Sequence, residues 1–426
     1  MSAYLSSIKD EPWRRPAARF LAVSLFCLGF LTVNADAAET FESAPAAHVS
    51  EILSPKLAQS VYHTVDTVKV VGRFYHFHIE SEYGQYDPPS LALLKIRVHE
   101  VRTLGQAVSE FARENTELSE QLHGQLSVRA NSAIDIISRP VSTATSLAGQ
   151  IAHKLDGTAS GPVNATASRL PADSVAMEYV ADPVMAMHRR NVAAQWRLDV
   201  YSGNPQVQEF LNEVAEARSA GQLSMGTPAL ARPGEYGVAD PQIEAAVAME
   251  LKTKTRDELA AQDRSLLAAM GVPNSTAAEF LANQTYSPSH RARLLYFLEA
   301  LKDVRDRSAF VEAAAQGVVD LQSELAFEQA AMILVRYDHH VDRVEKIYIG
   351  PQLMAAITRD LRIVYIAPVD IIYWSQPTAK LFTNLRQEAG KAGFKGWELV
   401  TAGDLTPMAK SALTKLGFTV RERFVD

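Results

Sequence analysis

The stretch Thr401–Val420 (TAGDLTPMAKSALTKLGFTV) decides the fold of the C-terminal part of this 426-residue chain. Thr406, placed before a proline, is typical of a helix start, and Gly417 is typical of a helix end. A strand that ends at Ala402 leads into this helix, and a second strand, Phe418–Phe424, follows it. The stretch therefore predicts a strand–helix–strand unit in which a crossover helix joins parallel strands.

The same alternation of strand and helix extends upstream of this unit. Arg362–Ala367 (RIVYIA) and Trp397–Ala402 (WELVTA) have the β-branched and aromatic composition of strands, and a helical pattern over Ala379–Ala392 separates them. Residues 351–426 are therefore predicted to form a small α/β unit with a short parallel sheet.

Helix start and stop signals dominate residues 241–350, which we predict to be a helical bundle. Thr255 and Glu258 fit a capping box, in which each side chain bonds an amide of the first helical turn. Ser287 is an N-cap placed directly before a proline. The next long helix is expected to carry one continuous apolar face over Phe327–Val344.

The N-terminal half of the chain combines strands with long helices. Val61–Ile79 is rich in Val, Tyr, Phe and Thr, and the turn residues in and after it predict a β-hairpin. Apolar residues then recur at three- and four-residue steps over Leu91–Phe111, as one buried helix face requires. We assign the hairpin and long amphipathic helices to residues 38–156, and a linker-rich helical segment to residues 157–240. The predicted fold class is α+β and predominantly helical.

The most regular apolar repeat in the chain runs over Ile134–Leu155. Steps of three and four residues alternate along it, and basic residues lie on its flanks. Two interpretations stay open, namely a helix packed in the core and a helix that binds a membrane surface or a partner protein.

The beginning of the chain has the layout of an export signal. Basic residues precede the apolar run Phe20–Val33, and the small-residue sequence Ala35–Ala37 (ADA) follows it. Because the run is shorter than the roughly 20 apolar residues that span a bilayer, a cleaved signal peptide is predicted over residues 1–37. The single cysteine, Cys27, lies inside this signal. We therefore expect a periplasmic protein without disulfides, with a peripheral location at a membrane as the alternative.

Composition and motif searches exclude several function classes. The net charge of −7, without clustered Lys and Arg in the mature chain, excludes nucleic-acid binding. The sequence contains no glycine-rich phosphate loop, nucleophile elbow or zinc-protease helix motif. We therefore expect no cofactor and no nucleotide, and the pattern favours a protein without catalytic activity.

Histidines form two clusters whose chemistry would suit a metal ion. His76 and His78 alternate with glutamates along a predicted strand, while His339 and His340 lie in Asp338–Glu345, whose acidic residues form a stripe if the long helix continues. A solvent-facing strand edge and a solvated, ion-paired helix face are the alternatives. We predict no metal site, and the sequence leaves any catalytic residue unknown. These four histidines are the residues to examine, because a fold that joined both clusters would create a four-histidine site.

Four segments together resemble a family of uncharacterised exported bacterial proteins. They are Leu91–Leu104 (LALLKIRVHEVRTL), Leu198–Gln206 (LDVYSGNPQ), Phe280–Leu294 (FLANQTYSPSHRARL) and Thr401–Val420. The resemblance extends from about Val61 to the C-terminus. It implies export and one long architecture, and it implies no activity, substrate, cofactor or site residue.

These observations lead to three functional hypotheses. The first is a non-catalytic protein of the bacterial cell envelope that acts as a scaffold or binding partner for an envelope protein or a membrane surface. The second is a metal-dependent hydrolase that uses the histidine clusters. The third is an accessory protein that associates with a membrane through Ile134–Leu155.

Overall fold

The computed structural model describes residues 40–114, 116–130, 182–221, 223, 241–350 and 353–425. The predicted signal peptide and the repeat Ile134–Leu155 lie outside these residues. The chain divides into two units, Met1–Thr40 and Phe41–Asp426, and the elements described below all belong to the second. Within the described ranges, no helix has both the length and the apolar character that a membrane span requires.

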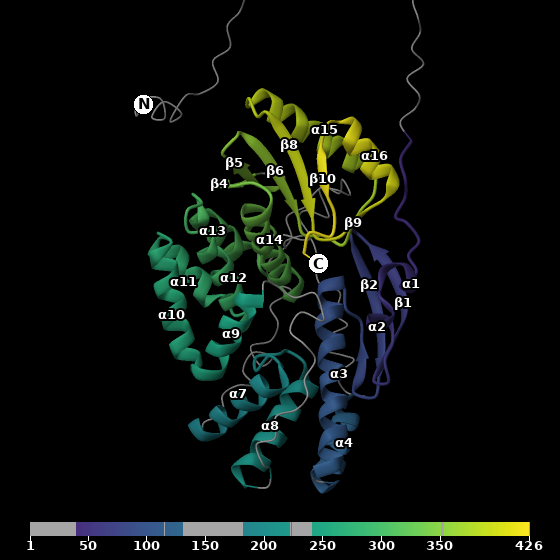
Figure 1. Cartoon of the computed structure of the whole chain (residues 1–426), viewed down its shortest axis with the longest axis vertical. Helices are drawn as coiled ribbons and strands as arrows, with labels where there is room; N and C mark the ends of the chain where they lie inside the picture. The colour runs from purple at the N-terminus through teal and green to yellow at the C-terminus, as the bar shows by residue number, and fades with distance from the viewer. Residues whose placement is uncertain are drawn as a thin grey trace, which may run out of the picture. The chain divides into compact units, whose positions relative to one another are not determined.

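The C-terminal part is built on a five-stranded sheet with the strand order β10-β8-β6-β5-β4 (Figure 1). The strands are β4 (Val344–Ile349), β5 (Met354–Thr358), β6 (Arg362–Ala367), β8 (Gly396–Thr401) and β10 (Thr419–Arg421). β6, β8 and β10 pair in parallel, as predicted, but β5 pairs antiparallel with both β4 and β6. The sheet is therefore mixed, because the turn between Thr358 and Arg362 is too short for the crossover that parallel neighbours need.

The two crossover helices lie where the sequence predicts them. They are α15 (Gln376–Lys391) and α16 (Pro407–Lys415). The hydroxyl of Thr406 accepts the N–H of Ala409, and Gly417 follows α16 with a φ of 83°, so both predicted ends of this helix are confirmed. The short strands β7 (Ile371–Ile372) and β9 (Asp404–Leu405) form a separate parallel pair.

The central part is helical, as predicted. Its helices are α9 (Pro241–Thr253), α10 (Arg256–Ala269), α11 (Asn274–Ala282), α12 (Pro288–Ala300), α13 (Arg307–Gly317) and α14 (Leu321–His340). The capping box at Thr255 and the N-cap at Ser287 are both present. The predicted extension of the long helix to Val344 is wrong, because α14 ends at His340. The buried carboxylate of Asp338 accepts the N–H of Val344 at 2.8 Å, and this contact leads the chain out of the helix into β4.

The N-terminal part contains the predicted hairpin and a third short strand. β1 (His63–Val71) pairs antiparallel with β2 (Phe74–Ser81), which pairs in turn with β3 (Gly84–Tyr86). Helices α1 (Val49–Ile52) and α2 (Pro55–Ala58) precede these strands. The other helices that the structure describes here are α3 (Leu91–Glu114), α4 (Thr116–Ala130), α7 (Pro183–Trp196) and α8 (Pro205–Ser219). Apolar side chains from β2, α3, α4, α7 and α8 share one core, in which Ile79 and Leu94 are fully buried.

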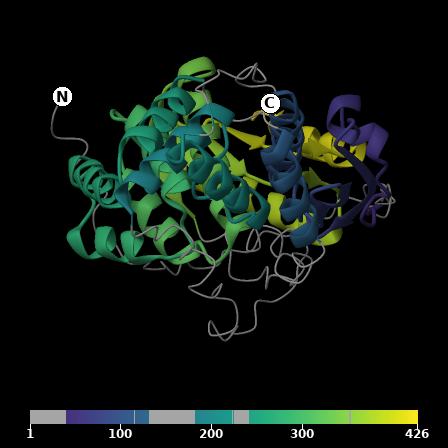
Figure 2. The ribbon, with the colours of Figure 1, turned by 90° about the horizontal axis from the view of Figure 1, so that it is seen from below.

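The turn of the hairpin is anchored to the C-terminal part by Arg73, and both views place the hairpin beside the C-terminal helices (Figures 1 and 2). The buried guanidinium of Arg73 donates hydrogen bonds to the carbonyl of Tyr373 at 3.0 Å, to the hydroxyl of Ser375 at 3.0 Å and to that of Thr378 at 2.8 Å. It also lies over the Tyr373 ring, 3.6 Å from the ring centroid. The backbone carbonyl of Arg73 accepts the N–H groups of Asp370 and Ile371, in the segment that follows β6.

Asp370 connects the same two parts from the C-terminal segment. One oxygen of its buried carboxylate accepts the N–H of Tyr75 in β2 at 3.0 Å and the N–H of Leu91 at 2.8 Å. Because Leu91 is the first residue of α3, Asp370 caps this helix from a position 279 residues away in the chain. Gly403 lies against the same segment, and a Cβ atom there would be 1.9 Å from the carbonyl oxygen of Asp370.

Replacing Asp370 tests how much this connection stabilises the fold. Asp370→Ala leaves the amides of Tyr75 and Leu91 without their acceptor, so we expect the free energy of unfolding to fall by roughly 2 to 5 kcal/mol. Asp370→Asn keeps an acceptor oxygen on a side chain of the same shape, so its free energy of unfolding is expected to fall much less. Urea denaturation of the two variants and the wild type measures the difference. If both variants lost the same free energy of unfolding, the hydrogen bonds from Tyr75 and Leu91 would not explain how Asp370 stabilises the fold.

Candidate functional sites

The first predicted histidine cluster lies on β2. His76, His78 and Glu80 occupy alternate positions of this strand, while the intervening Phe77 and Ile79 are buried. Glu82 lies beyond the strand and forms an ion pair of 3.5 Å with His123 of α4. The four polar residues that alternate in the sequence are therefore not gathered at one point.

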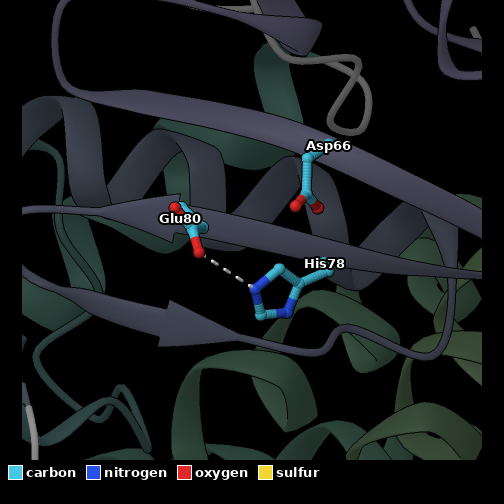
Figure 3. Close-up of side chains that lie close together, drawn as sticks. All are labelled: Asp66, His78 and Glu80. Atoms are coloured by element: carbon cyan, nitrogen blue, oxygen red, sulfur yellow. Dashed lines mark ion pairs between the residues drawn. The ribbon is translucent and has the colours of Figure 1, made fainter.

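The structure brings a different set of residues together around His78. Asp66 of β1, His78 and Glu80 each offer one ligand atom, and these atoms all lie within 4.8 Å of one another. Figure 3 shows the three side chains on neighbouring strands, with a dashed line between His78 and Glu80. The distance from Nε2 of His78 to Oε1 of Glu80 is 3.8 Å. Of the four candidate histidines, only His78 belongs to this group, which we call the hairpin cluster.

Sequence reasoning missed Asp66 because the pairing register decides its position. β1 and β2 pair regularly up to Val65 and again from Thr67, and the register shifts between these two residues. Asp66 is thus the extra residue of a β-bulge, a feature that re-aims a side chain. The available signal was a lone acidic residue within a run of strand-forming residues.

Asp87 completes the surroundings of His78. One of its carboxylate oxygens lies 2.7 Å from Nδ1 of His78. This hydrogen bond raises the pKa of His78, burial lowers it, and the charges of Asp66 and Glu80 raise it further, so that the net shift is upward. For His76, in contrast, burial lowers the pKa of the side chain.

The second histidine cluster lies at the end of α14. His339 and His340 are exposed, and their ring centroids are 6.2 Å apart. The acidic stripe predicted beside them does not exist, because α14 ends at His340, Asp342 lies in the connection after it and Glu345 lies on β4. Glu345 pairs with Arg305 at 2.5 Å. Among the residues that the structure describes, no group of metal-ligating side chains includes His339 or His340.

A second group of polar and charged residues lies in the interior, between α9, α12, α14 and the segment after α7. We call this group the buried centre; its members are Asp199, Glu244, Ser289, His290, Arg293, Glu324 and Glu328. Nδ1 of His290 lies 2.7 Å from Oε2 of Glu328, and Nε of Arg293 donates to Oε1 of Glu244 at 2.7 Å. Ser289, which is fully buried, donates to Asp199. The carboxylate of Glu324 accepts the N–H of Ser287 at 2.9 Å. Helices that are far apart in the sequence thus meet through polar contacts.

Burial and charge act against each other within the buried centre. Burial raises the pKa of Glu324 to about 8, although the positive charge of His290 lowers it. For His290 itself, burial lowers the pKa, but the charges of Glu324 and Glu328 and the hydrogen bond to Glu328 outweigh it and raise the pKa to about 9. In Glu328 the nearby His290 and Arg293 prevail over burial and lower the pKa. Burial therefore favours the neutral form of Glu324, while the hydrogen bond between His290 and Glu328 favours an imidazolium–carboxylate pair.

No family model, curated protein or solved structure matches this chain. The resemblance of four of its segments to exported bacterial proteins stays a prediction.

The two sites differ in what they can do chemically. A neutral carboxyl group beside an ionised pair has the protonation states of an acid–base site. However, His290, Glu324 and Glu328 are only 2 to 9% exposed, and each is bonded to the protein, which is typical of a structural network. The hairpin cluster is open to solvent and offers one imidazole and two carboxylates to a ligand. The buried centre was missed in the sequence because its members lie on separate helices.

The protonation of Glu324 predicts a pH dependence of stability. Because its pKa is raised in the folded state, the folded protein holds this proton more tightly than the unfolded chain does. Stability is therefore lost as the pH rises from the unfolded value of 4.5 towards about 8. Glu324→Gln stays neutral and keeps an acceptor oxygen. From pH 6 to pH 9 it is expected to gain about 2 kcal/mol relative to the wild type, or roughly 2 to 3 °C in Tm for a folded unit of this size.

Thermal unfolding of both proteins at pH 6 and pH 9 measures this difference. Glu299→Gln is the matched control, because Glu299 is exposed on the same helix, α12, that contributes His290. A Tm difference between the Glu324 variant and the wild type that does not change with pH would contradict the prediction.

Proposed function

We propose that this protein is an exported, non-catalytic component of the bacterial cell envelope that acts as a scaffold or binding partner. The sequence supports export through the apolar run Phe20–Val33 and the small residues after it. The buried centre supports the non-catalytic part of the proposal, and it is the observation that carries it.

His290, Glu324 and Glu328 of the buried centre are out of reach of a substrate. A catalytic acid or base must come within hydrogen-bond reach of a substrate, directly or through one water molecule. His290 and Glu328 instead bond to each other, and Glu324 bonds to the amide of Ser287. These groups connect α12 with α14, so their chemistry is used to hold helices together. The metal-dependent hydrolase lacks the comparable support of a joined histidine site among the described residues.

Binding to envelope components tests the proposed role. We expect the untagged protein to co-sediment with purified peptidoglycan sacculi, to float with vesicles of phosphatidylethanolamine and phosphatidylglycerol, or to do both. Ile137→Asp places a charge at an apolar position of the repeat, and Ser138→Asp is its control at the neighbouring polar position. Loss of flotation in the Ile137 variant alone would favour the membrane-associated accessory protein. If the protein bound neither material nor any envelope protein, the proposal would lose its support.

Export makes a separate prediction. Signal peptide cleavage requires small residues before the cleaved bond, so Ala37→Phe is expected to leave an unprocessed precursor in bacteria that express the full chain. Glu39→Gln, which lies beyond the predicted bond, should be processed like the wild type. Cell fractionation and mass spectrometry of the N-terminus measure both outcomes. A wild-type protein that keeps residues 1–37 and stays in the cytoplasm would refute the predicted export.

A further inference from the structure

We propose that Asp66, His78 and Glu80 form a binding site for a divalent cation of the zinc class on the hairpin. This inference goes beyond the scaffold role and does not depend on it, since a metal ion can bind the hairpin whatever the rest of the protein does. It rests on the distances in the hairpin cluster, on the orientation of His78 and on the local charge.

The distances fit a site that needs only side-chain adjustment. Zinc binds histidine nitrogen and carboxylate oxygen at about 2.0 to 2.2 Å, so the donors of a tetrahedral site lie about 3.3 Å apart. In the hairpin cluster all three donors already lie within 4.8 Å of one another. Asp66 and Glu80 are exposed, which leaves their side chains free to close the remaining distance around an ion. A water molecule would provide the fourth ligand.

The backbone that carries the three ligands is held in one register. β1 and β2 are paired on both sides of the bulge, from His63 opposite Ser81 to Val71 opposite Phe74. The buried side chains of Val65 and Ile79 lock this register, because a slip by one residue would bring them to the solvent side. Within this frame the bulge places the carboxylate of Asp66 beside His78 (Figure 3). The site is therefore built by the strand pairing, and a flexible loop is not required.

His78 has the orientation that a metal ligand needs. Its Nδ1 lies 2.7 Å from Asp87, and Nδ1–H donation to this carboxylate leaves the lone pair of Nε2 for a metal ion. Nε2 is the nitrogen that lies towards Glu80, at 3.8 Å. A carboxylate that orients an imidazole in this way is the usual outer-shell partner of a metal-bound histidine. Asp87 is therefore the positioning residue of the proposed site.

Charge and ligand type select the class of ion. Three carboxylates surround one imidazole, so the site has an excess of negative charge that a divalent cation neutralises. An imidazole nitrogen among the donors favours zinc and similar transition metals over magnesium and calcium, which prefer all-oxygen ligands.

Isothermal titration with zinc chloride tests the proposal on the untagged protein at pH 7.5. We expect one zinc ion per chain, and at least tenfold weaker binding in His78→Ala and in Asp66→Asn. Asp87→Asn should keep the stoichiometry but lower the affinity by about 10- to 100-fold, the usual effect of losing an outer-shell partner. His76→Ala is the matched control, because it removes a neighbouring imidazole of the same strand that lies outside the cluster.

Circular dichroism of each variant separates loss of ligand from loss of fold. All four substituted side chains are at least partly exposed, so the variants are expected to keep the wild-type spectrum. The proposal is overturned if the wild type binds no zinc, if folded His78→Ala binds zinc like the wild type, or if His76→Ala abolishes binding. Preference for calcium over zinc in the same titration would also overturn it.

Discussion

The fold depends on the contact between the turn of the N-terminal hairpin and the segment that follows β6. Arg73 makes this contact from the hairpin and Asp370 makes it from the segment after β6, and both side chains are buried. A buried charge or polar group is costly unless its bonds are satisfied, so each residue requires the other segment to be in place. Since Asp370 also caps α3, one carboxylate determines where a strand, a helix and the C-terminal part meet. The first and last parts of the folded unit are therefore interdependent.

Buried polar groups whose partners lie on distant segments also occur in the interior of the other parts. Glu398, at the centre of the parallel strands, is fully buried and accepts a hydrogen bond from the hydroxyl of Tyr337 in α14 at 2.9 Å. In the buried centre, His290 of α12 meets Glu328 of α14. Such pairs add little net stability when they are complete, but they penalise any arrangement in which one partner is missing. These penalties fix which helices and strands contact each other in a protein without disulfides.

The interior and the surface of the protein carry two different kinds of titratable groups. His290, Glu324 and Asp370 have strongly raised pKa values, and all three hold elements together in the buried centre or beside the hairpin. Perturbed pKa values often mark catalytic sites, yet structural networks produce them as well. The hairpin cluster is different, because its imidazole and carboxylates are accessible and are held by strand pairing. The accessible hairpin suits the proposed cation site, and the bonded interior suits the proposed scaffold.

The sequence by itself determined the fold class and many element boundaries. Thr255, Ser287 and Thr406 begin helices through bonds to amides three residues away, so their effect is visible in a short stretch of sequence. Only the tertiary structure decided the end of α14, the antiparallel strand β5, the role of Asp370 and the two sites. Asp66 and His78 meet because of a shift in strand register, and His290 meets Glu328 because two helices pack together. Local hydrogen bonds can be read from neighbouring residues, whereas contacts between distant segments exist only after the chain has buried its apolar faces.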